Sequence, residues 1–314
     1  MAINWGGVEA FTRDMVEPTI QDQIFETSPL LTILKAKAPK EKTGKKVRVL
    51  VQYAKNTGAG SYSGADLLPT VRNEKFADTE LDWRQSQSGP IVLNGDEEFK
   101  NSGPEEIADL VQAEIQNAKE SIRDEIAEQL YTNGTGNASK DVTGLIAAVD
   151  DGTTINTYAG IARLTYTWWK SGLHNWSATP ITLNALHIVN QARTDGGIRP
   201  DYVISNDDFY NKMYELILPS QRQYNDQMGQ AGFTNLRVDG RTLVVDGYCG
   251  ATDAWVLNSK YLDLIMAKGR NFVLEPFQKP VNQDARITRI LWAGQFVDRS
   301  CRRHARIKLY DITI

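Results

Sequence analysis

The residues best suited to catalysis in this 314-residue chain are three histidines and two cysteines. His174, His187 and His304 are far apart in the sequence and lack the spacing of metal ligands, so we expect each to be structural. Cys249 and His304 could in principle act as a nucleophile and its base, but nothing in the local sequence supports that pairing. Two cysteines are too few for a disulfide framework or a structural zinc site. We therefore expect Cys249 and Cys301 to be free thiols that pack as small hydrophobic side chains.

Other catalytic motifs are also missing from the sequence. There is no Gly-Lys-Ser/Thr phosphate loop, no His-Glu-x-x-His motif and no nucleophile elbow. Gly58, Gly60 and Gly64 resemble a nucleotide-binding fingerprint only in part, because they open no predicted helix. The pairs Asp150-Asp151 and Asp207-Asp208 fall at predicted turns and caps, where aspartate is favoured for backbone reasons. The sequence therefore predicts no catalytic residue, no cofactor and no metal site.

Two basic clusters are the remaining charged features. They comprise Lys35, Lys37, Lys40, Lys42, Lys45, Lys46 and Arg48, and Arg299, Arg302, Arg303, Arg306 and Lys308. Such clusters can contact nucleic acid or an acidic partner, or form solvated ion pairs of little energetic value. The net charge of −4 argues against a protein built to grip nucleic acid. No apolar run is long enough to span a membrane, and residues 1–7 show no signal-peptide pattern.

The first third of the chain, which carries the first basic cluster, has the pattern of an arm followed by a hairpin. In residues 1–43 apolar residues recur at helical spacing but are interrupted by Pro18 and Pro29, which predicts short helical pieces. Such a broken arm cannot bury its apolar face alone. Residues 45–55 and 76–93 read as two extended stretches joined by a Gly/Ser/Asn-rich tip. A hairpin this long needs a partner surface.

Residues 104–132 form the clearest predicted element. Apolar residues from Ile107 to Leu130 step by three or four, Pro104 suits the first turn, and Asn133-Gly134 ends the pattern. At about 1.5 Å per residue the helix would be roughly 42 Å long. We expect it to lie across a sheet supplied by two long strands in the tail, at 286–297 and 303–312.

The remaining segments predict a loop-rich region and an α/β unit. Residues 134–180 carry the aromatic cluster Tyr166, Trp168, Trp169 and Trp176, which we interpret as a core or interface anchor rather than a site that stacks sugars or bases. Residues 180–275 predict helices at 183–193 and 207–217, the second capped by Asn206 or Asp207. Strands are predicted at 201–205, 243–245, 254–257 and 262–266, and we expect the polar segment 221–232 to be mobile.

This order of elements, with several local phrases, resembles the major capsid proteins of tailed bacteriophages, of the Hong Kong ninety-seven-type fold. The phrases are Ser28-Pro29-Leu30-Leu31, Gln129–Gly134, Gly144-Leu145-Ile146 and Thr157–Arg163. The resemblance covers the whole chain and implies an α+β fold. It implies an N-terminal arm at 1–43, an extended loop at 44–95, a peripheral domain at 96–179 with a spine helix at 104–132, an axial domain at 180–275, and return strands to the peripheral domain at 276–314.

The resemblance also implies the function. The protein would not be an enzyme but would assemble, through interlocking arms and loops, into an icosahedral shell of pentamers and hexamers around double-stranded DNA. It implies a separate scaffolding protein and a portal, weak non-specific contact with DNA, no membrane, and assembly in the bacterial cytoplasm into a virion capsid. Within such a shell we predict inter-subunit contacts at Lys45, Lys46, Arg48, Trp83, Glu105, Glu106, Arg302 and Arg303.

Three further points stay open at this stage. Some members of the family crosslink lysine to asparagine, and Lys55 and Asn56 are candidates by position alone. An encapsulin-like compartment shell shares this fold and would hold protein cargo instead of DNA. A hydrolase or transferase that uses residues 180–275 is the alternative from another class, and it would need a deep polar pocket there.

Overall fold

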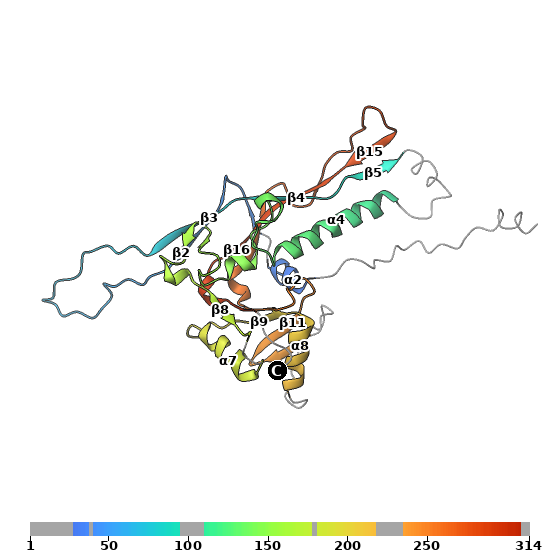
Figure 1. Cartoon of the computed structure of the whole chain (residues 1–314). Helices are drawn as coiled ribbons and strands as arrows, with labels where there is room; N and C mark the ends of the chain where they lie inside the picture. Colours follow the sequence, from blue (N-terminus) through green and yellow to red (C-terminus); the bar gives the residue numbers. More distant parts are fainter. Residues whose placement is uncertain (1–27, 38–39, 95–109, 178–180, 218–234, 309–314) are drawn as a thin grey trace, which may run out of the picture. The chain divides into compact units, whose positions relative to one another are not determined.

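The computed structural model describes residues 28–37, 40–94, 110–177, 181–217 and 235–308. Figure 1 shows the whole chain as a ribbon. The chain divides into two compact units. The larger unit takes in the described residues of 26–86, 123–273 and 291–314, and the smaller one those of 87–122 and 274–290. The predicted mobile segment 221–232 lies outside the described residues.

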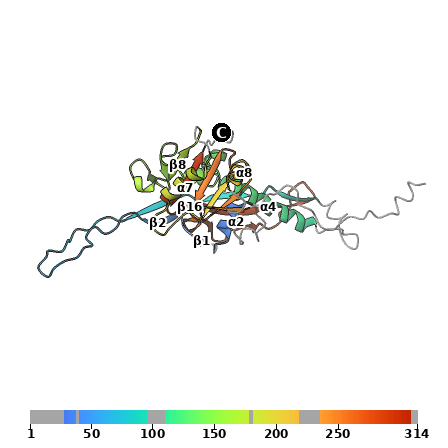
Figure 2. The ribbon, with the colours of Figure 1, turned by 90° about the horizontal axis from the view of Figure 1, so that it is seen from below.

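A six-stranded sheet forms one part of the larger unit, in the order β10-β11-β9-β12-β17-β8. Its strands are β8 (Gly172–Asn175), β9 (Tyr202–Ser205), β10 (Asn235–Val238), β11 (Arg241–Val245), β12 (Asp253–Leu257) and β17 (Ala305–Lys308). Helices α7 (Leu183–Ala192) and α8 (Asp207–Leu216) lie beside it in both views (Figures 1 and 2). Leu186 of α7 and Phe209 of α8 share one buried cluster with Leu243, Val256 and Ile307 of the sheet. The two predicted helices and the strands predicted at 201–205, 243–245 and 254–257 are confirmed here, whereas the strand predicted at 262–266 belongs to the second sheet. The Asn206 side chain accepts a hydrogen bond from the backbone of Phe209 at the start of α8, as predicted.

A second sheet in the chain follows the order β1-β13-β16-β14, and β4 also pairs with β16. Its strands are β1 (Lys40–Lys42), β4 (Arg84–Gln87), β13 (Leu262–Ala267), β14 (Val273–Leu274) and β16 (Ile290–Asp298). The expectation that the two tail strands share one sheet is wrong. β17 instead pairs with β12 and β8 in the six-stranded sheet, because Ala305 and Ile307 complete the apolar core there.

The described end of the predicted arm is buried in its own chain. Helix α2 (Pro29–Lys35) begins at the N-cap Ser28 and buries Leu30, Leu31, Ile33 and Leu34. Downstream of it, β1 pairs in parallel with β13. The resemblance implied an arm whose partners are other copies, and this is wrong for residues 28–42, because they pack within their own chain and their apolar side chains complete the core of the larger unit. Residues 1–27 lie outside the described part.

The predicted hairpin is present but shorter than expected. Strands β2 (Val47–Gln52) and β3 (Phe76–Leu81) pair antiparallel, with Val47 opposite Leu81 and Gln52 opposite Phe76. Residues 53–75 between them form a loop with no strand (Figure 1). The second extended stretch is not one strand, because after β3 the chain forms β4 and then β5 (Ile91–Asn94), which pairs with β15 (Ala285–Thr288).

Helix α4 (Leu110–Gln129) is the described part of the predicted spine helix. The apolar stripe is confirmed here, because Ala118, Ile122, Ile126 and Leu130 are buried. The predicted start at Pro104 with Glu105 and Glu106 lies outside the described residues. After α4 the chain turns through Gly144, where any side chain would collide with the carbonyl oxygen of Leu130.

The segment after α4 is held by a buried arginine and by tryptophans. It contains the short elements α5 (Gly136–Ser139), α6 (Leu145–Ala148), β6 (Thr157–Tyr158), β7 (Ile161–Ala162) and η2 (Thr167–Trp169). Arg163 is fully buried and donates to the carbonyl oxygens of Ala147, Ala148, Ile155 and Trp169. Trp169 and Trp176 are buried, which confirms their interpretation as core anchors.

Candidate assembly surface and cationic cavity

Strands β2 and β3 and the loop between them expose large apolar side chains, Leu50 and Phe76 on the strands and the others on the loop. They are Leu50, Tyr62, Leu67, Leu68, Val71 and Phe76, with exposed fractions of 77, 67, 100, 58, 80 and 66%. A contiguous segment with this much exposed apolar surface is typical of a protein–protein interaction site. The described part of the chain leaves these side chains uncovered, as the sequence predicted for a hairpin that needs a partner.

The base of the loop is fixed while its tip is free. The ring of Tyr53 stacks on that of Trp168 with centroids 4.8 Å apart and planes at 12°. Trp83 was predicted to contact another subunit, but its indole N–H donates to the carbonyl oxygen of Gly44 at 2.8 Å. The loop therefore leaves the body in a defined direction.

The charges of the hairpin are paired across its two strands. Lys46 lies 3.1 Å from Glu80 and 3.8 Å from Asp82, and Arg48 pairs with Glu80 and with Asp78 at 3.5 Å. The hydrogen bond between Lys46 and Glu80 raises the pKa of the lysine and lowers the pKa of the glutamate. Such exposed pairs contribute little stability.

The other predicted contact residues are distributed over several places. Arg302 and Arg303 both reach Asp195, at 3.0 and 3.4 Å, and Arg303 also lies over the ring of Tyr261. Lys45 is exposed. Glu105 and Glu106 lie outside the described residues. The inter-subunit role of all eight residues stays a prediction.

A buried carboxylate joins the two basic clusters, which sequence reasoning missed. Asp263 on β13 is 2% exposed and lies 2.6 Å from Lys40, 3.6 Å from Lys37 and 2.5 Å from Arg299. The signal was present in the sequence, since a charged residue between Leu262 and Leu264 must find partners once its strand is buried. This junction connects the described end of the arm to the second sheet.

A second buried carboxylate, Asp246, connects α2 to the end of α4. Its Oδ2 accepts from the hydroxyls of Ser28 and Tyr131, at 2.6 and 2.7 Å, and from the backbone N–H of Leu30 at 3.3 Å. Its Oδ1 accepts from the N–H of Tyr248 at 3.1 Å. Burial raises the pKa of Asp246, while these hydrogen bonds oppose the rise. No sequence pattern singled out this residue.

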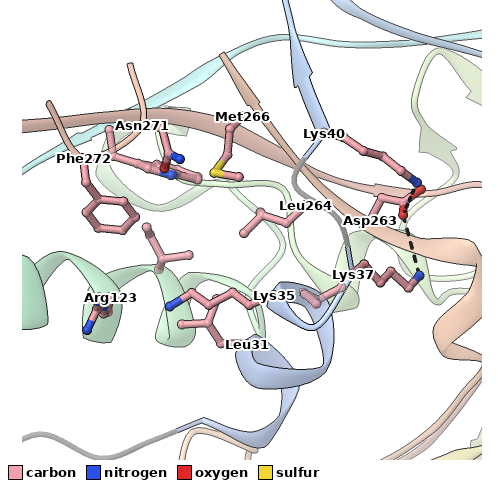
Figure 3. A pocket seen from close by; sticks show the side chains of 13 residues that line it. Leu31, Lys35, Lys37, Lys40, Arg123, Asp263, Leu264, Met266, Asn271 and Phe272 are labelled. Carbon is pink, nitrogen blue, oxygen red and sulfur yellow. Dashed lines mark hydrogen bonds and ion pairs between the residues drawn. The ribbon is translucent and has the colours of Figure 1, made fainter. Parts of the chain in front are cut away.

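A cavity of about 290 Å³ lies where α2, α4 and β13 meet in the larger unit (Figure 3). Its apolar lining consists of Leu31, Leu34, Ile126, Leu264, Met266, Phe272 and Trp292. Ile126 of α4 therefore lies near Leu264 of β13 and Trp292 of β16, as expected for a helix that lies across a sheet. The charged lining is four basic side chains, Lys35, Lys37, Lys40 and Arg123, and one acidic one, Asp263.

Two of these cations lack an anionic partner among the described residues. Lys37 and Lys40 lie near Asp263, whereas Lys35 and Arg123 form no ion pair in the described structure. Partial burial of the amine, with the nearby charge of Arg123, lowers the pKa of Lys35 to about 8. Arg123 lies over the ring of Phe272, 6.0 Å from its centroid. An anion placed between the two side chains would relieve their repulsion.

The pairing of Cys249 with His304 is not present. His304 is fully buried, accepts at Nδ1 from the N–H of Asn258, and lies 3.2 Å from Asp298. The thiol of Cys249 contacts the carbonyl oxygen of Asp253. Both cysteines are free and buried as predicted, and burial raises their pKa values well above the usual range. Across the described segments, no three potential ligand residues cluster around a possible metal site, and no helix is long and apolar enough to cross a membrane.

Comparison with known proteins gives matches only among solved structures; no family model and no curated protein sequence matches. A cyanophage A-1(L) capsid structure aligns at a TM-score of 0.74 and 17% identity over 95% of this chain and 96% of the other. The capsid of a native GTA particle aligns at 0.68 and 10% identity, over 99 and 100% of the two chains. The SrpI encapsulin complex of Synechococcus elongatus PCC 7942 aligns at 0.66 and 9%, over 100 and 98%. The expected α+β fold, that of tailed-phage capsid proteins, is confirmed by these alignments, which cover 95 to 100% of the chain.

Proposed function

We propose that this chain is a major capsid protein that assembles with copies of itself into a closed icosahedral shell. The observation that carries the proposal is the loop at 53–75, whose large apolar side chains are uncovered on a chain with the capsid fold. Monomeric proteins rarely expose so much apolar surface, whereas a shell subunit can bury it against a neighbouring subunit. The role is structural, and we propose no catalytic activity.

The five-part division of the chain belongs to this proposal. Residues 1–43 act as the arm, 44–95 as the extended loop, 96–179 and 276–314 as the peripheral domain, and 180–275 as the axial domain. The sheets support a division with two changes. Strands β8 and β17, which the division assigns to the peripheral domain, belong to the six-stranded axial sheet, and β13, which it assigns to the axial domain, belongs to the sheet of β16. Residues 28–42 of the arm then belong to the body of the subunit.

The content and partners of the shell are proposed on the resemblance and on charge. Double-stranded DNA is the proposed content, and the net charge of −4 favours weak, non-specific contact with it. A separate scaffolding protein and a portal complete the proposed assembly, which takes place in the bacterial cytoplasm and ends in the virion capsid. Arg302 and Arg303 have an acidic partner within the chain, which leaves less positive charge for DNA.

Electron microscopy of the purified protein, with size-exclusion chromatography, tests the proposal. We expect closed shells, tubes or discrete pentamers and hexamers. The matched control replaces residues 56–72 by a short Gly/Ser linker, which keeps the β2–β3 pairing and should give a folded protein that does not assemble. A wild-type protein that stays monomeric at every concentration, with a candidate scaffolding protein added, would refute the proposal.

A compartment shell is the second proposed function, favoured by the alignment with the SrpI encapsulin complex at a TM-score of 0.66. The two functions differ in what the shell holds. Nuclease treatment of isolated particles followed by nucleic-acid extraction and mass spectrometry distinguishes them. Protected DNA supports the capsid, and a co-purifying protein cargo without DNA supports the compartment.

The hydrolase or transferase alternative receives less support. It requires a deep polar pocket in residues 180–275, whereas the cavity described above takes only five of its thirteen lining residues from that range, and three of the five are apolar: Leu264, Met266 and Phe272. The nucleophile candidate Cys249 and the base candidate His304 have separate partners. These contacts do not favour an enzymatic function.

A further inference from the structure

The cavity between α2, α4 and β13 has the character of a site for an anionic, partly apolar group. Its walls are aliphatic and aromatic, while Lys35 and Arg123 lie on the same side of it without an ion-pair partner in the described structure (Figure 3). Both residues are exposed in the single chain, so an anionic group that docked between them would meet two cations that no carboxylate already occupies. The lowered pKa of Lys35, about 8, is consistent with that missing partner.

The tip of the loop offers a group with the complementary character. Asp66 is followed by Leu67 and Leu68, which are 100 and 58% exposed, and Val71 nearby is 80% exposed. The carboxylate of Asp66 accepts a hydrogen bond from the backbone N–H of Ser63 at 2.7 Å, which fixes the turn that presents the leucines. The described structure gives Asp66 no cationic partner.

We infer that the cavity of one copy receives the segment Asp66–Leu68 from the loop of a second copy. In this arrangement the carboxylate of Asp66 lies between Lys35 and Arg123, and the two leucines cover the apolar wall that includes Leu264 and Phe272. The loop tip supplies an anion for the two cations of the cavity, and docking buries the exposed apolar side chains of the loop. The inference rests on the proposed self-assembly and specifies one contact of it.

The source of the segment is a second copy because of where the loop leaves the subunit. Within the larger unit, the loop runs away from α2 in both views (Figures 1 and 2). The stacking of Tyr53 on Trp168 holds its base in that direction. The competing occupant is the chain's own segment 1–27, which precedes α2 and also contains acidic and apolar residues.

Disulfide trapping tests the contact in the full-length protein. One preparation carries Leu67→Cys and the other Asn271→Cys, since Asn271 is an exposed residue of the cavity lining. Cys249 and Cys301 are buried and do not compete. The two preparations are co-assembled, oxidised, and analysed by non-reducing electrophoresis. Val281→Cys, at a position 98% exposed on the smaller unit, replaces Leu67→Cys as the matched collision control.

Charge exchange tests the ionic part of the contact. Because like charges at an interface are strongly unfavourable, we expect Lys35→Glu or Asp66→Lys alone to lower the yield of the Leu67–Asn271 product by about tenfold. We expect the mixture of both variants, with the lysine now on the loop and the glutamate in the cavity, to restore most of the yield. A merely destabilising substitution would not be rescued by its partner.

The outcomes separate this inference from the proposed function. Product well above the Val281 control that follows the charge exchange supports the docking. Particles that form normally with product at the control level overturn the docking and leave the shell function standing. Absence of both particles and product overturns both. A disulfide between Asn271→Cys and a cysteine placed in residues 1–27, without the Leu67 product, assigns the cavity to the arm and overturns the docking.

Discussion

Replacing Asp246 with alanine should uncouple helix α2 from the end of α4. The carboxylate accepts hydrogen bonds from the hydroxyls of Ser28 and Tyr131 and from the N–H of Leu30, and the three donors are buried with it. Asp246→Ala leaves these donors without an acceptor, at a cost of roughly 1–3 kcal/mol for each group. Allowing for partial relaxation, we expect a loss of about 4 kcal/mol in the free energy of unfolding.

A graded series separates the network from a simple cavity effect. Asp246→Asn retains an acceptor oxygen, so it should cost about 1–2 kcal/mol. Tyr131→Phe removes a donor instead of stranding one, so it should cost about 1 kcal/mol. Tyr62→Phe, on an exposed tyrosine of the loop, is the control and should leave the stability unchanged.

Urea denaturation of the unassembled protein, followed by tryptophan fluorescence, measures these differences. Trp255 lies 6.4 Å from Tyr131 between ring centroids and reports on this region. Equal stability of Asp246→Ala and Asp246→Asn would show that the hydrogen bonds contribute nothing beyond packing. The reasoning would be refuted if Asp246→Ala stayed within about 0.5 kcal/mol of wild type, the range of an ordinary surface substitution.

Three other predictions concern single side chains of the larger unit. Arg163→Ala removes a donor from four carbonyl oxygens, of which, in the described structure, only that of Ala148 keeps another, the hydroxyl of Ser171. The substitution should cost about 4 kcal/mol, whereas Arg163→Lys should cost less; equal losses would contradict this. Trp168→Ala removes the stacking on Tyr53 and should speed hydrogen exchange and proteolysis of the loop while lowering global stability by only about 1 kcal/mol. Lys35→Met should raise the melting temperature at pH 7 but not at pH 10.5. A folded-state pKa of about 8, below the ordinary 10.5, means that the charged lysine destabilises the fold below pH 8 and that this penalty disappears as the pH rises to 10.5. No gain at pH 7 would indicate that Lys35 is already paired.

Local elements of this fold follow from the sequence because their signals are local. The stripe of α4 and the start of α8 at Asn206 are set by side chains within a few turns of each other. Strands β9 and β12 are short apolar runs that read correctly for the same reason. In each case the periodicity of burial determines the element, whatever lies against it.

Which strands pair with one another could not be predicted from local patterns. Strands β16 and β17 both carry apolar patterns, and nothing in either pattern says that β16 pairs with β13 while β17 pairs with β12. The predicted extended stretch 76–93 likewise divides into β3, β4 and β5, which pair with three different strands, β2, β16 and β15. For the arm, the apolar spacing predicted that α2 is buried, but it did not identify the surface that covers α2. That surface belongs to the same chain.

The candidate site shows the same division between local and long-range information. Charge runs such as Lys45-Lys46 and Arg302-Arg303 are conspicuous in the sequence, whereas Asp263 and Asp246 are single carboxylates. The carboxylates matter more in the structure, because each gathers partners from segments more than 100 residues apart. A lone charge in an apolar strand is therefore a stronger indicator of a long-range contact than a run of charges on a surface.

The distribution of satisfied and unsatisfied groups indicates where this subunit is complete and where it is not. Five described lysines and arginines were predicted from charge runs to contact other subunits. Lys45 is exposed, but the other four, Lys46, Arg48, Arg302 and Arg303, have carboxylates beside them in the same chain. Binding a neighbour through them would first require breaking those pairs, with little net gain. Binding through Lys35 and Arg123, or through the uncovered loop tip, would require no intrachain ion pair to break. An inter-subunit contact is therefore better sought where the folded chain leaves a charge and an apolar surface unsatisfied together than where the sequence merely concentrates charge.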